Sequence, residues 1–162
     1  MRKALNVSGV DPKPVPASSD RVFVLDQFTP YRIVSLGHMF SRKLAKAYAD
    51  ENITIPEWRV LAVVAQSQSL AARDVVRFTP MDKMSVSRAI ASLEKKKFAE
   101  RTVSETDRRV NMIALTKEGR ALFDKIAALA LAVEDELLGE LSPQEHQRFV
   151  ATLAKLEAAA VT

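Results

Sequence analysis

Residues 81–97 (MDKMSVSRAIASLEKKK) hold the side chains of this chain that are best suited to binding another molecule. Val86, Ile90 and Leu93 stand at the spacing that places three apolar side chains on one face of a helix. The opposite face then carries a methionine, short hydroxyls and bases, including Arg88. In the major groove of DNA, arginine can bond guanine, serine can bond bases or phosphates, and methionine can touch thymine methyl groups. An ordinary amphipathic helix with a basic solvent face has the same pattern, so both interpretations stay open.

No other set of residues predicts a catalytic or metal-binding site. The chain has no cysteine, which excludes disulfides, thiolate metal sites and cysteine nucleophiles. Its two histidines, His38 and His146, stand 108 positions apart, and the sequence contains no phosphate loop and no nucleophile–base pair. We therefore expect a protein that is not an enzyme and that needs neither a cofactor nor a metal.

Length and composition predict one mainly helical domain. A chain of 162 residues can bury a real core, and four glycines with 6% aromatics favour helices. No apolar run is long enough to span a membrane. Residues 1–20 lack the apolar stretch of a signal peptide and contain three prolines, so we expect a disordered arm on a cytoplasmic protein.

The charge is unevenly distributed along the chain. Residues 56–120 carry thirteen bases and eight acids, whereas residues 121–162 carry three bases and seven acids. A basic middle favours a polyanion as the partner of that segment, and the acidic, apolar tail must have another role.

Hydrophobic periodicity and capping residues divide the chain into elements. Thr54 with Glu57, and Ser142 with Glu145, have the spacing of capping boxes, and Thr116 can cap a third helix. Either Thr79 or Asp82 can cap the helix that contains Arg88. The predicted helices cover 28–49, 55–65, a short segment from Ser69, 82–97, 117–138 and 143–159, and the predicted strands cover 98–103 and 110–115.

The order of these elements is more specific than any one of them. Two helices, a groove helix and a hairpin with basic residues at its tip follow one another in the order of a winged helix-turn-helix. The predicted fold is therefore mainly α with a small β-hairpin wing, and the remaining helices are left for another task.

With these pieces in place, the chain resembles the MarR family of bacterial regulators. The resemblance covers about residues 30–157 and is carried by ITIPEWRVL (53–61), MSVSRAI (84–90), LEKK (93–96), DRR (107–109) and LTKEGR (115–120). One departure is visible: the family usually has Lys-Gly-Leu-Val where the groove helix ends, and this chain has Lys97-Phe98-Ala99 after Lys96. Without that glycine the turn is expected to differ or to be strained.

The resemblance implies a homodimer that binds a palindromic double-stranded DNA operator. It assigns 21–52 to an N-terminal dimerisation helix, 53–115 to the winged helix-turn-helix and 116–162 to C-terminal dimerisation helices. The implied role is a transcriptional regulator, usually a repressor, that a small aromatic carboxylate or its thioester releases from DNA. A winged helix used as an architectural or protein-binding module, without a small-molecule effector, is the alternative.

Candidate DNA contacts fall into three groups. Arg88 and Ser87 are the first candidates for base contact, with Lys83, Met84 and Ser85 beside them. At the wing, Arg109 and Arg108 are expected over the minor groove, and Asp107 is expected to organise the loop. We expect phosphate contacts, and no base contacts, from the remaining basic residues, Lys95, Lys96, Lys97 and Arg101. A generic solvated face is the competing interpretation.

The resemblance places an effector pocket near the first, second and fifth helices. Arg59 could pair with a carboxylate, His38 could bond a hydroxyl, and Trp58 could stack on an aromatic ring. Further wall candidates on the first helix are Tyr31, Arg32, Ser35 and Met39. The competing interpretations are a core tryptophan, a surface ion pair for Arg59 and a structural histidine.

Overall fold

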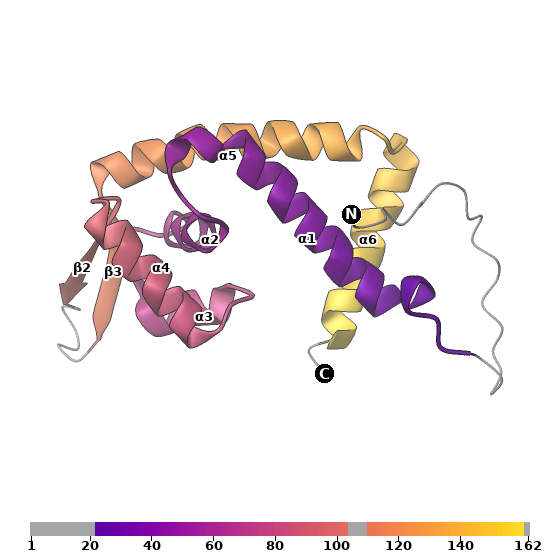
Figure 1. Ribbon diagram of the computed structural model, residues 1–162, viewed down its shortest axis with the longest axis horizontal. Coiled ribbons are helices and arrows are strands. Elements are labelled where there is room, and N and C mark those ends of the chain that lie inside the picture. The colour runs from indigo at the N-terminus through magenta and orange to yellow at the C-terminus, as the bar shows by residue number, and fades with distance from the viewer. Residues whose placement is uncertain (1–21, 104–109, 161–162) are drawn as a thin grey trace, which may run out of the picture. The chain divides into compact units, whose positions relative to one another are not determined.

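The computed structural model describes residues 22–103 and 110–160, and Figure 1 shows helices with one small antiparallel sheet. This confirms the predicted fold class, mainly α with a β wing. The expected arm at 1–20 and the wing-tip residues Asp107, Arg108 and Arg109 lie outside the described residues. The elements are η1 Leu25–Gln27, α1 Thr29–Ala47, η2 Ala49–Glu51, α2 Ile55–Val64, β1 Leu70–Ala71, α3 Ala72–Phe78, α4 Lys83–Lys95, β2 Ala99–Val103, β3 Asn111–Leu115, α5 Lys117–Leu138 and α6 Pro143–Ala160.

The helix starts follow the capping residues in the sequence. Thr54 and Glu57 form a reciprocal capping box at α2, in which the Thr54 amide donates to the Glu57 carboxylate at 2.6 Å. At α4 the cap is Asp82, whose carboxylate accepts from the Ser85 amide at 2.8 Å. Thr116 Oγ1 accepts from the Gly119 amide at 3.0 Å and begins α5.

A third strand corrects the predicted start of α3. The sequence suggested a helix from Ser69, but Leu70 and Ala71 form β1, which pairs with β3 opposite Ile113 and Met112, and α3 begins at Ala72. The sheet order is β1-β3-β2, with all pairs antiparallel, so β3 is its central strand. Ile113, fully buried at the middle of β3, anchors the sheet to the helices.

The chain divides after Leu36 into two units. In the second unit, α2, α4, the sheet and the first half of α5 share one core, to which Tyr48, Leu61, Leu93, Ile113 and Ile126 contribute fully buried side chains. This core fixes the direction of α4, because Val86, Ile90 and Leu93 all point into it.

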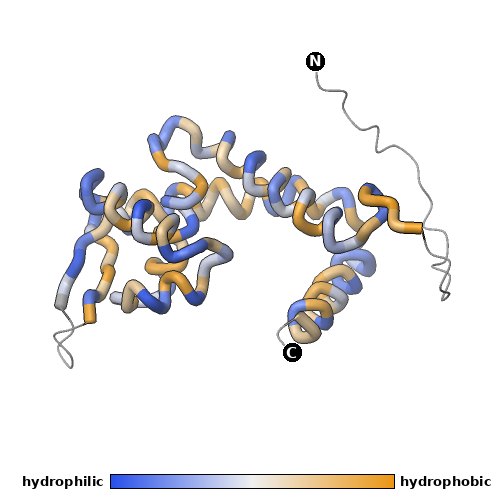
Figure 2. The backbone as a smooth tube through the Cα atoms, turned by 60° about the horizontal axis from the view of Figure 1, so that its bottom comes forward, coloured by the Kyte–Doolittle hydropathy of each residue, from blue (hydrophilic) through white to orange (hydrophobic). Residues whose placement is uncertain are grey.

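The first unit contains the described residues 22–36. Its ring pair is Phe23 and Phe28, whose centroids lie 5.2 Å apart across η1. The large apolar side chains of this segment, from Val22 at 81% exposure to Leu36 at 38%, remain open to solvent. Figure 2 shows the apolar stretch as an orange tube where the described chain begins.

The end of α4 confirms the departure noted in the sequence. Lys97 takes a left-handed conformation with φ of 63° at the position where the resemblance to the MarR family predicts glycine. The Lys97 amide bonds to the Glu94 carbonyl at 2.9 Å and the Phe98 amide to the Leu93 carbonyl at 2.9 Å, which is the Schellman arrangement. The turn is therefore kept. The left-handed conformation costs lysine free energy, because lysine has a Cβ.

The beginning of α5 is packed directly against that turn. A Cβ added to Gly119 would lie 1.8 Å from the Phe98 carbonyl oxygen. Thr116 reinforces the contact, because its hydroxyl donates to the Lys97 carbonyl at 2.7 Å. Only glycine permits this close approach.

Residues 22–103 and 110–160 contain neither a membrane-spanning helix nor a candidate metal cluster. None of the helices there has both the length and the apolar character of a membrane crossing. The same ranges hold no group of three or more His, Asp or Glu side chains that could surround a metal ion.

Candidate nucleic-acid interface

The outer face of α4 combines charge, hydroxyls and one large apolar side chain. Lys83, Ser87, Arg88 and Lys95 are exposed, and Met84 is 65% exposed, while the other face of the helix lies in the core. A short helix held this firmly by its apolar side presents its polar side as a rigid surface.

A chain of hydrogen bonds orients Arg88 on that surface. The Ser85 hydroxyl donates to Asp82 at 2.6 Å and lies 3.4 Å from Arg88 Nη2, which donates to it. The hydrogen bonds from Ser85 lower the pKa of Asp82, so this cap is a carboxylate at neutral pH. The half-buried Ser85 is thus engaged on both sides, and Arg88 is directed along the helix toward its N-terminus.

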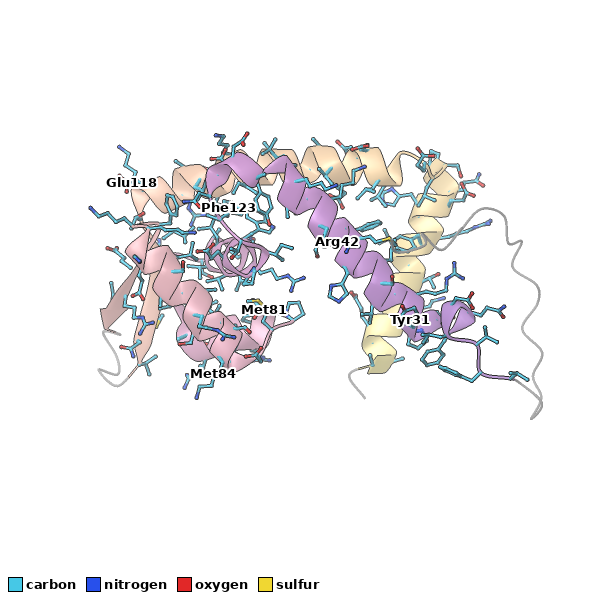
Figure 3. All side chains as sticks on the ribbon, in the orientation of Figure 1. Tyr31, Arg42, Met81, Met84, Glu118 and Phe123 are labelled. Carbon is cyan, nitrogen blue, oxygen red and sulfur yellow. The ribbon has the colours of Figure 1, made fainter. Side chains whose placement is uncertain are left out.

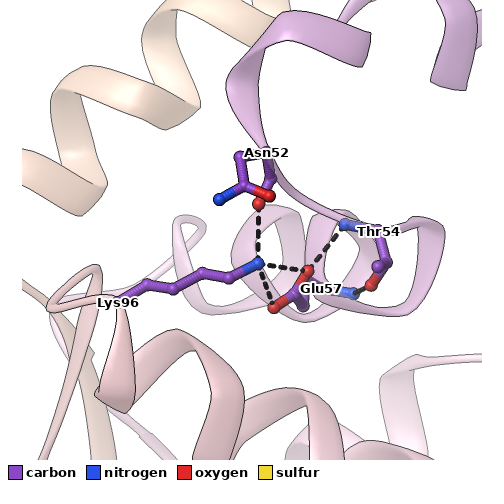
Figure 4. Close-up of polar contacts among 4 residues, drawn as sticks. All are labelled: Asn52, Thr54, Glu57 and Lys96. Atoms are coloured by element: carbon purple, nitrogen blue, oxygen red, sulfur yellow. Dashed lines mark hydrogen bonds and ion pairs between the residues drawn. The ribbon is translucent and has the colours of Figure 1, made fainter.

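Below this surface, a buried ion pair joins α4 to α2 (Figure 4). Lys96 Nζ lies 2.7 Å from Glu57 Oε1 and donates to the Asn52 carbonyl at 2.6 Å. Burial by itself raises the pKa of Glu57, but hydrogen bonds from Lys96, Ser92 and Thr54 outweigh it, so the pKa lies below its ordinary value. From the sequence, the Lys96 ammonium was expected to contact phosphate. It points instead to the Glu57 carboxylate.

A hollow of about 250 Å³ opens beside the ion pair, between the start of α2 and α4. Its lining residues come from these two helices and include Arg88 and Lys96: Thr54, Pro56, Glu57, Ser85, Arg88, Ala89, Ser92 and Lys96. One side of Arg88 therefore faces this hollow, and the rest of its side chain is exposed.

Bases on two neighbouring elements extend the surface. Arg101 on β2 is exposed and pairs with Glu94 through its Nε at 3.0 Å. Arg73 and Arg77 on α3 are exposed, and Arg77 lies 5.6 Å from the centroid of the Phe78 ring. Arg73 and Arg77 were not predicted from the sequence, although their four-residue spacing on the helix before α4 was an available signal.

The effector candidates lie in different surroundings. Trp58 stacks on Phe123 with centroids 5.9 Å apart and lies 6.0 Å from Tyr48, so it belongs to the margin of the core. Arg59 Nη2 donates to Ser41 Oγ at 3.2 Å. Burial raises the pKa of Tyr48, and Arg59 opposes this shift.

The remaining effector candidates lie on α1. His38 and Met39 are exposed in the second unit. The described part of the first unit contains Tyr31, Arg32 and Ser35, of which Tyr31 is 44% exposed. These residues are accessible to another molecule.

Taken together, a helix-turn-helix with a polar outer helix and a β wing defines the class of winged helix-turn-helix DNA-binding proteins. The model of the MarR family matches residues 51–110, from the end of η2 to the residue before β3. Over these residues the chain is similar to the MarR family of transcriptional regulators.

Individual relatives agree with this assignment. The chain is 24% identical to the HTH-type transcriptional repressor Rv2887 of Mycobacterium tuberculosis over 126 residues, covering 78% of this chain and 91% of the relative. A MarR/EmrR family regulator from Acinetobacter has a similar structure, with a TM-score of 0.76 at 27% identity over 85% of this chain and 98% of that one.

A further solved structure shares the fold. It belongs to BpsR of Bordetella bronchiseptica, a protein whose DNA binding is regulated by 6-hydroxynicotinic acid. The similarity has a TM-score of 0.75 at 22% identity and covers 85% of this chain and 98% of BpsR.

Proposed function

We propose that this protein is a homodimeric transcriptional repressor that binds a palindromic operator through α4 and is released by a small aromatic acid. The observation that carries the proposal is the outer face of α4, where Arg88 is exposed and oriented while the opposite face is locked in the core. The N-terminal part of such a helix contacts base edges in the major groove.

The side chains divide into base-reading and phosphate-binding sets. Arg88 reads guanine, with Lys83, Met84 and Ser87 beside it, and Ser85 orients the guanidinium through Asp82. Phosphate contacts come from the surrounding bases, Arg73, Arg77, Lys95 and Arg101. From outside the described residues, we propose minor-groove contacts for Arg108 and Arg109 and a supporting role for Asp107.

Dimerisation uses the segments flanking the winged helix, 21–52 and 116–162. Large apolar side chains in these segments stay exposed in the single chain, among them Leu131, Phe149, Val150, Leu153 and Leu156 at 38–60%. Exposed apolar surface of this kind marks a protein–protein interface. A two-fold dimer places its reading helices about 34 Å apart, which matches the half-sites of a palindrome.

An aromatic acid relieves repression by favouring a different spacing of the two winged helix-turn-helix heads of the dimer. Regulation of BpsR by 6-hydroxynicotinic acid, in a protein of the same fold, supports this chemical class. The candidate contacts are His38, Trp58 and Arg59, with Tyr31, Arg32, Ser35 and Met39. To convert the dimers from nearly all competent for DNA binding to nearly none, the ligand must bind the second spacing about 10⁴-fold more tightly than the first.

The test compares two arginine variants on a duplex that the full-length protein selects from a random library. Arg88→Ala is expected to lose about 1–3 kcal/mol of specific binding, because a bidentate guanine contact disappears. Arg42→Ala, which removes an exposed arginine from α1, is the matched control. Fluorescence anisotropy at two salt concentrations measures both variants.

Four outcomes contradict the proposal. Selection that yields no palindrome, with a steep salt dependence retained, indicates an architectural protein. A binding constant that is independent of salt indicates a protein-binding module. Unchanged discrimination by Arg88→Ala removes α4 from the reading surface, and saturating aromatic acids that leave operator affinity unchanged remove the effector class.

A further inference from the structure

We propose that Met84 is a specificity-determining residue that reads the methyl group of a thymine about two base pairs from the guanine read by Arg88. This inference rests on the proposed function, because it assigns one more base to the same reading surface. It gives Met84 a defined task, which its exposure alone leaves unexplained.

Met84 is the exception among the large apolar residues of α4. Val86, Ile90 and Leu93 are at most 2% exposed, whereas Met84 is 65% exposed. Met81, three residues earlier, packs against the core. In Figure 3, Met84 lies below the N-terminal end of α4, on its outer side. An exposed apolar side chain there gains free energy when an apolar group of a partner covers it.

The position of Met84 on α4 limits which partner group it can reach. It is the second residue of the helix and shares a face with Ser87 and Arg88, three and four residues later. The first turn of a recognition helix is the part that enters the major groove most directly. The apolar group that bases present in that groove is the C5-methyl of thymine.

A chain of hydrogen bonds joins three polar neighbours of Met84, and Met84 itself lies outside that chain. Asp82 caps the helix and holds Ser85, and Ser85 holds Arg88. The guanidinium is therefore fixed relative to the Met84 backbone by one helical turn. Four residues span about 6 Å along a helix, which is close to two base-pair steps of about 3.4 Å.

The thioether chain suits this task better than a branched residue. Methionine is unbranched and polarisable, so it adapts to a methyl group whose exact height varies with local DNA shape. A half-site read in this way contains a guanine and a thymine at a fixed short spacing, on either strand. Replacement of that thymine by cytosine removes the methyl group and weakens binding.

The experiment removes only the methyl group. The full-length protein selects a half-site from a random duplex library, and each thymine near the selected guanine is then replaced in turn by deoxyuridine. At one position the wild-type affinity is expected to fall about fourfold, the value for one buried methyl group. Deoxyuridine outside the half-site is the control.

The Met84 variants locate the contact on the protein. Met84→Ala is expected to bind the thymine and deoxyuridine duplexes equally, whereas Met84→Leu is expected to keep most of the discrimination. Because Met84 is exposed, Trp58 fluorescence is expected to show that both variants remain folded. The inference is overturned by a half-site without a nearby thymine, by a wild-type protein that ignores deoxyuridine, or by Met84→Ala retaining the fourfold difference.

Arg88→Ala separates failure of this inference from failure of the proposed function. If Arg88→Ala loses selectivity while deoxyuridine has no effect, α4 reads the operator and only the role of Met84 is wrong. If Arg88→Ala also leaves selectivity unchanged, the reading surface itself lies elsewhere on the protein.

Discussion

The head and the helical ends of the second unit differ in how much of their apolar side chains is exposed to solvent. In the head, residues 53–126, large apolar side chains such as Leu61, Leu93 and Ile113 are completely buried. In the helical ends, residues 127–160, Leu131 is 60% exposed and Val150 is 52% exposed. Both behaviours occur along α5, where Leu122 and Ile126 are buried and Leu131 is not.

This contrast separates two sources of stability. The head supplies its own core and is expected to fold without help. The helical ends have too few internal contacts to bury their apolar faces, which supports the proposal that a second copy covers them. Changes in the head are therefore expected to alter its free energy of unfolding, and changes in the ends are expected to alter assembly.

The largest expected effect on the head comes from Gly119→Ala. The added Cβ would lie 1.8 Å from the Phe98 carbonyl oxygen, so the end of α4 and the start of α5 must separate. We expect a loss of more than about 4 kcal/mol in the free energy of unfolding. Urea unfolding followed by Trp58 fluorescence measures it, because the one tryptophan lies in the head.

A matched glycine controls for the general effect of alanine. At Gly37, within α1, an added Cβ meets no atom within 4 Å. Gly37→Ala is expected to stabilise the helix by about 0.5–1 kcal/mol. Equal effects of the two substitutions would show that the contact with Phe98 does not constrain the head.

The second effect concerns the ion pair between α2 and α4. Glu57→Gln keeps the size of the side chain and its capping role but leaves the Lys96 ammonium without its carboxylate. Glu57 has only 3% of its side chain exposed, so we expect a loss of about 3 kcal/mol. Lys96→Met, which leaves the carboxylate unpaired, is expected to cost a similar amount.

The same pair predicts a pH dependence with a defined sign. The pKa of Glu57 is lowered in the folded protein, so its contribution is complete above the ordinary glutamate pKa and is lost as pH falls through the folded value. Between neutral pH and that region, Glu57→Gln should flatten the acid limb of the stability curve. An acid limb identical to wild type would contradict this assignment.

A smaller effect, and an increase in the free energy of unfolding, is expected from Lys97→Gly. The left-handed conformation of Lys97 costs a residue with a Cβ about 1 kcal/mol. Glycine removes this cost, partly offset by its greater freedom in the unfolded chain. The free energy of unfolding should therefore rise by up to about 1 kcal/mol, while Lys95→Gly, at a right-handed position of α4, should lower it.

The smallest effect on the head is expected from substitutions in α6. Leu153→Ser and Leu156→Ser, at residues 38% and 48% exposed, should change the unfolding of the head by less than about 0.5 kcal/mol. They should nevertheless convert a dimer to a monomer in size-exclusion chromatography with light scattering. A dimer that survives both substitutions would place the interface outside α6.

Local signals made much of the fold predictable. Thr54, Asp82 and Thr116 act within three residues of the amides they cap, so the sequence alone contains both partners. Strand β1 was missed because two residues show no periodicity, and its partner Ile113 lies far along the chain. The hairpin strands were predictable because each has five residues rich in apolar and β-branched types.

In the candidate site, too, local features could be predicted from the sequence and contacts between distant residues could not. The outer face of α4 followed from helical spacing, and Met84, Ser87 and Arg88 on it are exposed while Ser85 is half-buried. The inward turn of Lys96 could not be predicted, since its partner Glu57 lies 39 residues away and looked fully explained as a cap. The engagement of Ser85 by Asp82 is local, but competition between a cap and a base contact is decided only by geometry.

The close approach of Gly119 to Phe98 also has a mechanical consequence. The Phe98 carbonyl occupies the place where Gly119 lacks a side chain, and Thr116 is bonded to Lys97, so the start of α5 directly contacts the residues that end the reading helix. We therefore expect a tilt of α5 about its first turn to rotate α4 as well. An effector that bends the long helix would turn the DNA-facing one without touching it.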